Sequence, residues 1–243
     1  MPLMIRHVEC PEFRVLFSTA TQLSSIEDVD FVKNLQLNIY QPWQFEIHVE
    51  GAVENTEGLP KVYNRILDKY KGQYDAIVFI HDDITINDCL VYQKLKQSFD
   101  RGMDVVGVAG GKGWNRPKDE TRPVGWNVAS RECGTNGFII HKDVSPDGET
   151  HTFATSFGPS PARTLTVDGC FIALMNRGLE LRFDERFDFN HYDIDLSFQA
   201  YYKGLNVGVE PIILTHGSLG KGLLKPEFLD SQRKFIDKWF RRK

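Results

Sequence analysis

Apolar positions in the first third of the chain fall into short runs separated by segments with helical spacing. Residues 14–18 form one apolar run, residues 45–50 alternate between apolar and polar positions, and residues 76–80 read Ala-Ile-Val-Phe-Ile without interruption. An uninterrupted run of β-branched and aromatic residues is typical of a strand buried on both faces, as in the middle of a parallel sheet. We therefore predict three strands here, with residues 76–80 as an inner strand.

Helical periodicity separates these predicted strands. Apolar side chains recur at helical spacing in residues 28–38 and in residues 59–70, where Pro60 suits the first turn and Gly72 follows the last. The order βαβα then leads into the inner strand. This order predicts an α/β fold that is Rossmann-like, with a mostly parallel central sheet and helices on both faces.

The rest of the chain continues the pattern with longer interruptions. Further helices are predicted at residues 91–99, at residues 192–204 and from about residue 226, and further strands at residues 104–109, 137–141, 166–175 and 206–214. Residues 110–127 and residues 142–163 show no apolar periodicity. We interpret both stretches as long loops that act as lids or are mobile.

Composition narrows the class of protein. The 243 residues suit one large α/β domain spanning residues 1–243, with 41% hydrophobic residues and a formal net charge of −4. Without a basic excess, we expect no nucleic-acid partner. The four cysteines lie far apart, which favours free thiols in a reducing compartment. No stretch approaches the roughly 20 apolar residues of a membrane helix, so we expect a cytoplasmic protein.

The polar residues His81, Asp82 and Asp83 follow the inner strand directly. Open α/β sheets bind their ligands at the carboxyl ends of strands, and an imidazole with two carboxylates can hold a hard divalent cation. A lone pair of acids after a strand is more often a turn or a helix cap. The metal interpretation becomes favoured in combination with Asp193 and His216, which lie at a helix start and a strand end.

These stretches together resemble the metal-dependent glycosyltransferases of the GT-A fold, most closely the family 2-like members. His81-Asp82-Asp83 stands where that family has its Asp-x-Asp motif, and Tyr-Asp-Ile-Asp-Leu-Ser-Phe at residues 192–198 is similar to its acidic motif. His216 follows the last strand, as in the family. The resemblance extends from about residue 15 to about residue 220, and departs from the motif in having His81 at its first position.

The resemblance implies roles for individual residues. Asp83 and His216 would bind Mn²⁺ or Mg²⁺, and Asp193 would be the base that deprotonates the acceptor. Residues about 1–83 would form the nucleotide-binding half, and residues about 84–243 the acceptor half with the C-terminal helix. Residues on the donor side would be Glu50, Asn55, Asn64, His81 and Asp82, and residues on the acceptor side would be Trp114, Asp168 and Asp195.

Several of these residues have a structural alternative. Asp195 is also explained as a first-turn acid that stabilises its helix, and Asp168 as a strand-end acid bonded to the backbone. Trp114 and Trp126 either stack on an acceptor sugar or anchor their loop. The basic end at residues 238–243 allows weak contact with an anionic membrane, although cations at a helix C-terminus need no such partner.

The sequence thus predicts a transferase that moves a sugar from a nucleotide-diphosphate donor, UDP-linked, to an unknown acceptor. A base opposite the leaving diphosphate implies inversion. Gln199 begins Gln-Ala-Tyr-Tyr-Lys and not the Gln-x-x-Arg-Trp of processive members, which favours single addition. One alternative is a non-catalytic nucleotide-sugar binder of the same fold. A sugar-1-phosphate nucleotidyltransferase is disfavoured because residues 18–23 lack its Gly-rich stretch with Arg and Lys.

Overall fold

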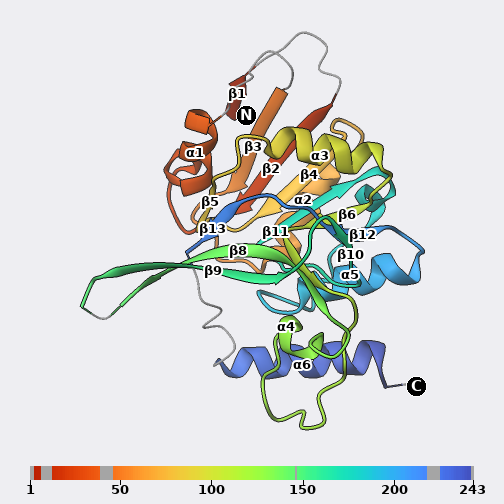
Figure 1. Ribbon diagram of the computed structural model, residues 1–243. Helices are drawn as coiled ribbons and strands as arrows, with labels where there is room; N and C mark the ends of the chain where they lie inside the picture. Colours follow the sequence, from red (N-terminus) through yellow and green to blue (C-terminus); the bar gives the residue numbers. More distant parts are fainter. Residues whose placement is uncertain (1–2, 7–12, 39–45, 146, 218–224, 242–243) are drawn as a thin grey trace.

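The computed structural model describes residues 3–6, 13–38, 46–145, 147–217 and 225–241. It is a mixed α/β structure in which a large sheet, with five of its eight described strands running in one direction, is joined by a smaller sheet (Figure 1). The large sheet has the strand order β1 (Leu3–Arg6), β3 (Glu46–Ala52), β2 (Arg14–Ala20), β4 (Ala76–Ile80), β11 (Phe171–Met175), β6 (Val105–Gly107), β12 (Val207–Val209) and β10 (Ala162–Arg163). The helices are α1 (Asp30–Asn38), α2 (Leu59–Tyr70), α3 (Val91–Asp100), α4 (Trp126–Ala129), α5 (Tyr192–Tyr202) and α6 (Pro226–Trp239).

Strand β4 is the inner strand that its apolar run predicts. It pairs in parallel with β2, and all of its residues are buried. Ala76, Val78 and Ile80 point into the core beneath α1 and α3, whereas Ile77 and Phe79 point into the core beneath α2, α5 and α6. Successive side chains of a strand face opposite sides, so a strand covered by helices on both faces must be apolar throughout. The predicted α/β fold with helices on both faces is confirmed.

Strand β11 runs against the direction of its neighbours. It pairs antiparallel with β4 on one side and with β6 on the other, with Ala173 opposite both Val78 and Val106. Because a strand buried on both faces is apolar throughout in either direction, the run at residues 166–175 predicts burial but not orientation. The strand also begins later than predicted, at Phe171, which leaves residues 168–170 free to line the strand ends.

A second, smaller sheet contains parts of two segments that the apolar pattern predicts as single strands. Its strand order is β5 (Ile84–Ile86), β13 (Leu214–His216), β8 (Thr135–Val144) and β7 (Ala109–Gly111), with β9 (Thr150–Gly158) paired to β8. The predicted strand at residues 104–109 is in fact split between β6 and β7. Likewise, the predicted strand at residues 206–214 is split between β12 and β13. In both places the chain leaves the large sheet and enters the small one.

The prediction of a loop over residues 142–163 is wrong for most of its length. Strands β8 and β9 form an antiparallel hairpin with His141 opposite Phe153, and it projects away from the body of the molecule (Figure 1). Most of β9 is exposed, so neither of its faces must be apolar and no alternation marks the strand. No helix among the described residues is both long and apolar enough to cross a membrane.

Candidate functional site

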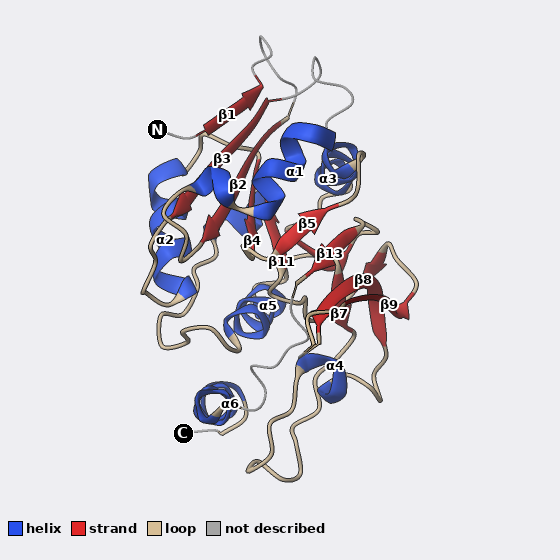
Figure 2. Cartoon of the chain, turned by 90° about the vertical axis from the view of Figure 1, so that its left-hand side faces the viewer, coloured by secondary structure: helices blue, strands red, loops and turns tan. Residues whose placement is uncertain are grey.

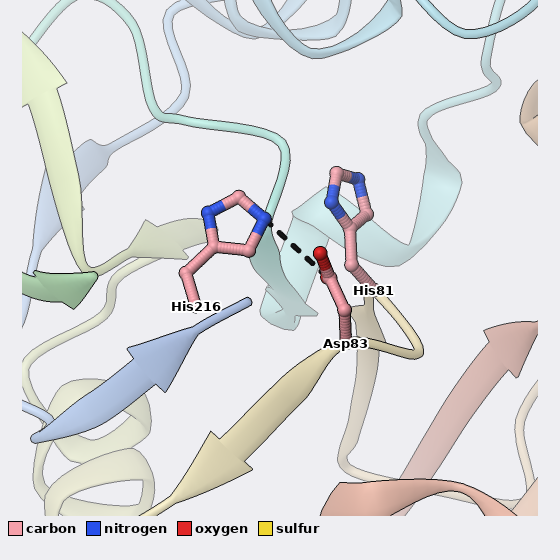
Figure 3. A group of neighbouring side chains, drawn as sticks. All are labelled: His81, Asp83 and His216. Atoms are coloured by element: carbon pink, nitrogen blue, oxygen red, sulfur yellow. Dashed lines mark ion pairs between the residues drawn. The ribbon is translucent and has the colours of Figure 1, made fainter. Parts of the chain in front are cut away.

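Three side chains with metal-binding atoms meet where the two sheets join. His81 follows β4, Asp83 precedes β5, and His216 ends β13; their ligand atoms all lie within 4.8 Å of one another (Figure 3). His216 Nε2 is 3.4 Å from Asp83 Oδ1. The pairing of β13 with β5 sets His216 opposite Ile84, the residue after Asp83. A long-range strand pairing therefore assembles the cluster from distant parts of the chain.

The hydrogen bonds of Tyr192 determine which nitrogen of His81 is available to a ligand. The Tyr192 hydroxyl donates its single hydrogen to Gly169 O at 3.0 Å, and the same oxygen lies 2.8 Å from His81 Nε2. The hydroxyl must therefore accept a hydrogen from Nε2. Neutral His81 is then protonated at Nε2, and its Nδ1 keeps a free lone pair. Figure 3 shows one nitrogen of this ring turned toward His216.

Burial and mutual charge shift the pKa values in this cluster. Burial lowers the pKa of His81, and the neighbouring His216 lowers it further. Burial alone would lower the pKa of His216 as well, but the Asp83 carboxylate beside it outweighs burial and raises it. For Asp83, burial would raise the pKa, but contact with His216 holds it below its ordinary value. The cluster therefore combines a neutral imidazole with an ionised carboxylate.

Two further acids, Asp168 and Asp193, bind the backbone of residues 169–170, just before β11. Asp193, in the first turn of α5, accepts a hydrogen bond from Gly169 N through Oδ2 at 2.9 Å. Asp168 accepts from Cys170 N at 2.9 Å and from Trp126 Nε1 at 2.7 Å. A Cβ on Gly169 would lie 2.5 Å from the Tyr192 hydroxyl, so this close approach requires glycine. The start of α5 is thus fixed against the end of the central strands.

The environments of the two acids raise the pKa of Asp193 and lower the pKa of Asp168. Burial raises the pKa of Asp193 to about 7, and repulsion from Asp168 acts in the same direction. Burial would also raise the pKa of Asp168, but the charge of His216 and the N–H groups of Cys170 and Trp126 lower it below its ordinary value. Acids whose environments move their pKa values apart can take different chemical roles. Asp193 is the one suited to exchange a proton near neutral pH.

The donor-side residues expected from the sequence lie in separate segments before and after β4 and on helix α2. Asp82 lies half-buried between His81 and Asp83. Asn55 closes a local turn, with hydrogen bonds to Glu57 N and Glu57 O. Asn64 is bonded to both the N–H and the carbonyl of Phe183, which fixes α2 against the segment before α5. The backbone of Glu50, in β3, pairs with that of Ser18, in β2. The side chain of Glu50 lies outside the described residues.

Two of the acceptor-side residues hold the C-terminal helix α6. Asp195 is fully buried and accepts hydrogen bonds from Trp239 Nε1 at 2.8 Å and from Lys238 Nζ and Gln199 Nε2, each at 2.9 Å. Trp114 is buried against Phe240, with ring centroids 5.3 Å apart. Of the three acceptor-side residues Trp114, Asp168 and Asp195, only Asp168 lies near Asp193, where both acids bind the backbone of residues 169–170.

Two functional contacts escaped the sequence prediction. Tyr192 stands next to Asp193 in the acidic stretch, but nothing local shows that its hydroxyl reaches His81. For Trp126 the sequence leaves open a sugar platform or a loop anchor, and its indole N–H donates a hydrogen bond to the Asp168 carboxylate. For Tyr192 the only available signal was its position next to Asp193, and Trp126 has no candidate residue next to it in the sequence.

The arrangement of the sheet and its helices is similar to that in solved structures of two glycosyltransferases. The chain has a GT-A-like fold. No protein-family model matches the sequence, and no curated protein matches it either. The fold assignment therefore depends on structural similarity, and it confirms the fold that the sequence resemblance implied.

Two solved structures carry this similarity. The mannosyltransferase PcManGT from Pyrobaculum calidifontis, in complex with GDP-Man and Mn²⁺, matches with a TM-score of 0.51 and 12% identity over 88% of this chain and 60% of its own. GalNAc-T7 with UDP, GalNAc and Mn²⁺ matches with a TM-score of 0.53 and 7% identity over 95% of this chain and 48% of its own. The chain thus spans about half to three-fifths of these two proteins. A197 from STIV also matches, over 84% of this chain, with a TM-score of 0.40.

Proposed function

We propose that the protein is a metal-dependent glycosyltransferase that moves a sugar from a nucleotide-diphosphate donor, UDP-linked, to a hydroxyl acceptor. The observation that carries the proposal is the cluster of His81, Asp83 and His216 at the carboxyl end of β4, with the half-buried acid Asp193 nearby. In open α/β sheets this edge is where ligands bind. The two solved structures that share the fold contain Mn²⁺ with GDP-Man or with UDP and GalNAc.

The cluster suits a divalent cation. Asp83 Oδ1 is buried and accepts no hydrogen bond from the described residues, and His81 has its Nδ1 lone pair free. Mg²⁺ prefers oxygen ligands, whereas Mn²⁺ also accepts imidazole, so two histidines with one carboxylate favour Mn²⁺. A cation bound there supplies positive charge to the departing diphosphate. His81, Asp83 and His216 would hold it.

The remaining chemistry belongs to the chain itself. Asp193 would take the proton of the acceptor hydroxyl, and a base with a pKa of about 7 is well matched to neutral pH. Its Oδ2 is oriented by Gly169 N, and Asp168 is oriented by Trp126, so the two carboxylates are preorganised. Attack on the side opposite the diphosphate would invert the anomeric carbon. The nucleotide would lie toward β2 and β3, near Asp82, Asn55 and Glu50.

The test begins with titrations of UDP in the presence and absence of Mn²⁺, followed by hydrolysis and transfer assays over a panel of nucleotide sugars. Asp83→Asn should abolish the Mn²⁺-dependent part of UDP binding. Asp193→Asn should leave that binding nearly unchanged while lowering turnover about 10²–10⁴-fold. The matched control is Asp68→Asn, which changes an exposed acid on α2 and should alter neither quantity.

Each result separates the candidate functions. UDP affinity that responds neither to Mn²⁺ nor to Asp83→Asn would refute the metal assignment. Mn²⁺-dependent UDP binding without hydrolysis or transfer for any donor would favour the non-catalytic binder of the same fold. Equal loss of UDP binding in Asp83→Asn and Asp193→Asn would move Asp193 from the acceptor side to the cation.

A further inference from the structure

A cavity of about 420 Å³ lies beside the end of α5, away from the metal-binding cluster. Figures 1 and 2 both place α6 beneath α5 at this side of the molecule. The volume falls within the roughly 300–1,000 Å³ range of small-molecule sites. The cavity is lined by Lys112, Trp114, Arg163, Thr164, Leu165, Phe198, Tyr201, Tyr202 and Phe240. None of His81, Asp83, His216, Asp168 or Asp193 belongs to this lining.

The aromatic part of the lining is a preformed surface. Phe240 packs on Trp114 with ring centroids 5.3 Å apart and on Phe198 with centroids 5.8 Å apart. Tyr202 stacks on Trp239 at 5.2 Å with parallel rings. Yet Tyr201 and Tyr202 keep 60% and 66% of their surface exposed, an unusual amount for large aromatic residues. An exposed tyrosine offers a flat apolar face and a polar hydroxyl to the same ligand.

The charged part of the lining is purely cationic. Lys112 and Arg163 are exposed, and within the part of the chain that the structure describes neither makes an ion pair with a carboxylate. No acidic residue lines the cavity, although the whole protein has a formal net charge of −4. The planar guanidinium of arginine pairs bidentately with carboxylate or phosphate groups. The cavity is therefore complementary to an anion that also has an apolar face.

We propose that this cavity is a second binding site and that it takes an anionic saccharide. The sugar ring would lie on the surface of Tyr201 and its neighbours, and a carboxylate or phosphate on that sugar would pair with Arg163 and Lys112. The choice of a saccharide rests on the proposed function, whereas the charge and the aromatic surface of the cavity do not.

The position of the cavity relates it to the acceptor side. Tyr201 lies two helical turns beyond Asp193 on α5, about 12 Å along the axis. The segment from Arg163 leads to Asp168, and its backbone is bonded to β7 on the way, through Leu165 N to Gly111 O at 2.7 Å. Helix α5 and the segment at residues 163–168 therefore each carry a cavity residue at one end and a site acid at the other. A sugar chain extending from Asp193 could reach the cavity.

The test measures binding directly, by calorimetry and tryptophan fluorescence, without metal or nucleotide. The probes are tetragalacturonate for a carboxylate, glucose 6-phosphate for a phosphate, and neutral maltotetraose and inorganic phosphate as controls. We expect at least one anionic sugar to bind, and both neutral sugar and free phosphate to bind at least tenfold more weakly. Arg163→Gln and Tyr201→Ala should each weaken binding about tenfold. Lys203→Gln removes an exposed cation from the same end of α5, outside the cavity, and should have no effect.

Several outcomes would overturn the proposal. These are no binding of either anionic sugar, equal binding of maltotetraose or inorganic phosphate, and equal weakening by Lys203→Gln and Arg163→Gln. Tighter metal-free binding of UMP at the same residues would make the cavity a nucleotide site. Saccharide binding in a protein that shows no Mn²⁺-dependent UDP binding would support the cavity while refuting the proposed transferase. Mn²⁺-dependent UDP binding in a protein that binds no anionic saccharide would refute the second binding site and leave the proposed transferase standing.

Discussion

Replacing Tyr192 by phenylalanine tests how the proposed metal site, His81, Asp83 and His216, is oriented. The substitution removes only the hydroxyl, which links His81 Nε2 at 2.8 Å to Gly169 O at 3.0 Å. The ring is buried among Tyr63 and Phe183, with centroids 6.0 Å and 6.1 Å away, and phenylalanine keeps these contacts. We therefore expect the variant to fold with its cluster present but less well oriented.

The magnitude follows from the number of bonds lost. Removal of a hydrogen bond that orients a metal-binding histidine typically lowers metal affinity about 10–100-fold. That range corresponds to about 1.4–2.7 kcal/mol, which is reasonable for one bond to His81 together with the freedom its ring gains. The buried carbonyl of Gly169 also loses its donor, so the free energy of unfolding should fall by about 1–3 kcal/mol.

The assay is a calorimetric Mn²⁺ titration beside urea unfolding of the same preparations. Tyr70→Phe is the matched control, because Tyr70 is a buried tyrosine on α2 whose hydroxyl has no hydrogen-bond partner among the described residues. It should change Mn²⁺ affinity less than twofold. Unchanged Mn²⁺ affinity in Tyr192→Phe, or an equal loss in Tyr70→Phe, would refute the role of the hydroxyl in orienting His81.

Three further predictions concern the titratable residues Asp193, His191 and Asp195. Because burial raises the pKa of Asp193 to about 7, kcat/KM should fall about tenfold per pH unit below that value, and a flat pH–rate profile from pH 5 to 8 would contradict the assignment of the base. Burial lowers the pKa of His191 to about 3, so its neutral form is favoured on folding; stability should be full above about pH 6.5 and fall by about 1.4 kcal/mol per pH unit down to about pH 3, a slope that His191→Gln should reduce in urea unfolding. Asp195→Asn removes a buried negative charge that binds Lys238 and Trp239. The free energy of unfolding should fall by roughly 2–3 kcal/mol. This is less than the ~3–5 kcal/mol for breaking a fully buried ion pair, because Lys238 is partly exposed. Unfolding of Asp195→Asn at the wild-type urea midpoint would contradict this attachment of α6.

Part of the cluster could be predicted because it is local. An unbroken apolar run fixes β4 as an inner strand, and the next residues must then lie at its carboxyl end, so His81 and Asp83 could be placed from sequence alone. His216 could be placed only at a strand end. Its approach to Asp83 depends on the pairing of β13 with β5, which joins segments far apart in the chain. No local pattern encodes such a pairing.

The direction of β11 and the hairpin of β8 and β9 escaped prediction for opposite reasons. Every side chain of β11 is buried, so its composition is the same whichever way the strand runs. Most side chains of β9 are exposed, so its composition is that of a polar loop. Alternation marks a strand only where one face is buried and the other is not. Strands at either extreme therefore depend on their partners for register and direction.

Hydrogen-bond accounting separates residues that can bind a ligand from residues that support the fold. Asn64 and Asp195 have the right chemistry, but Phe183 occupies both ends of the Asn64 amide, and Trp239, Lys238 and Gln199 occupy the carboxylate of Asp195. Asp83 Oδ1, by contrast, accepts no hydrogen bond from the described residues and is paired with His216 Nε2 at 3.4 Å, which is itself a candidate ligand atom. Ligand atoms that no hydrogen bond occupies, grouped within 4.8 Å of one another, therefore make His81, Asp83 and His216 the better candidates for binding a cation.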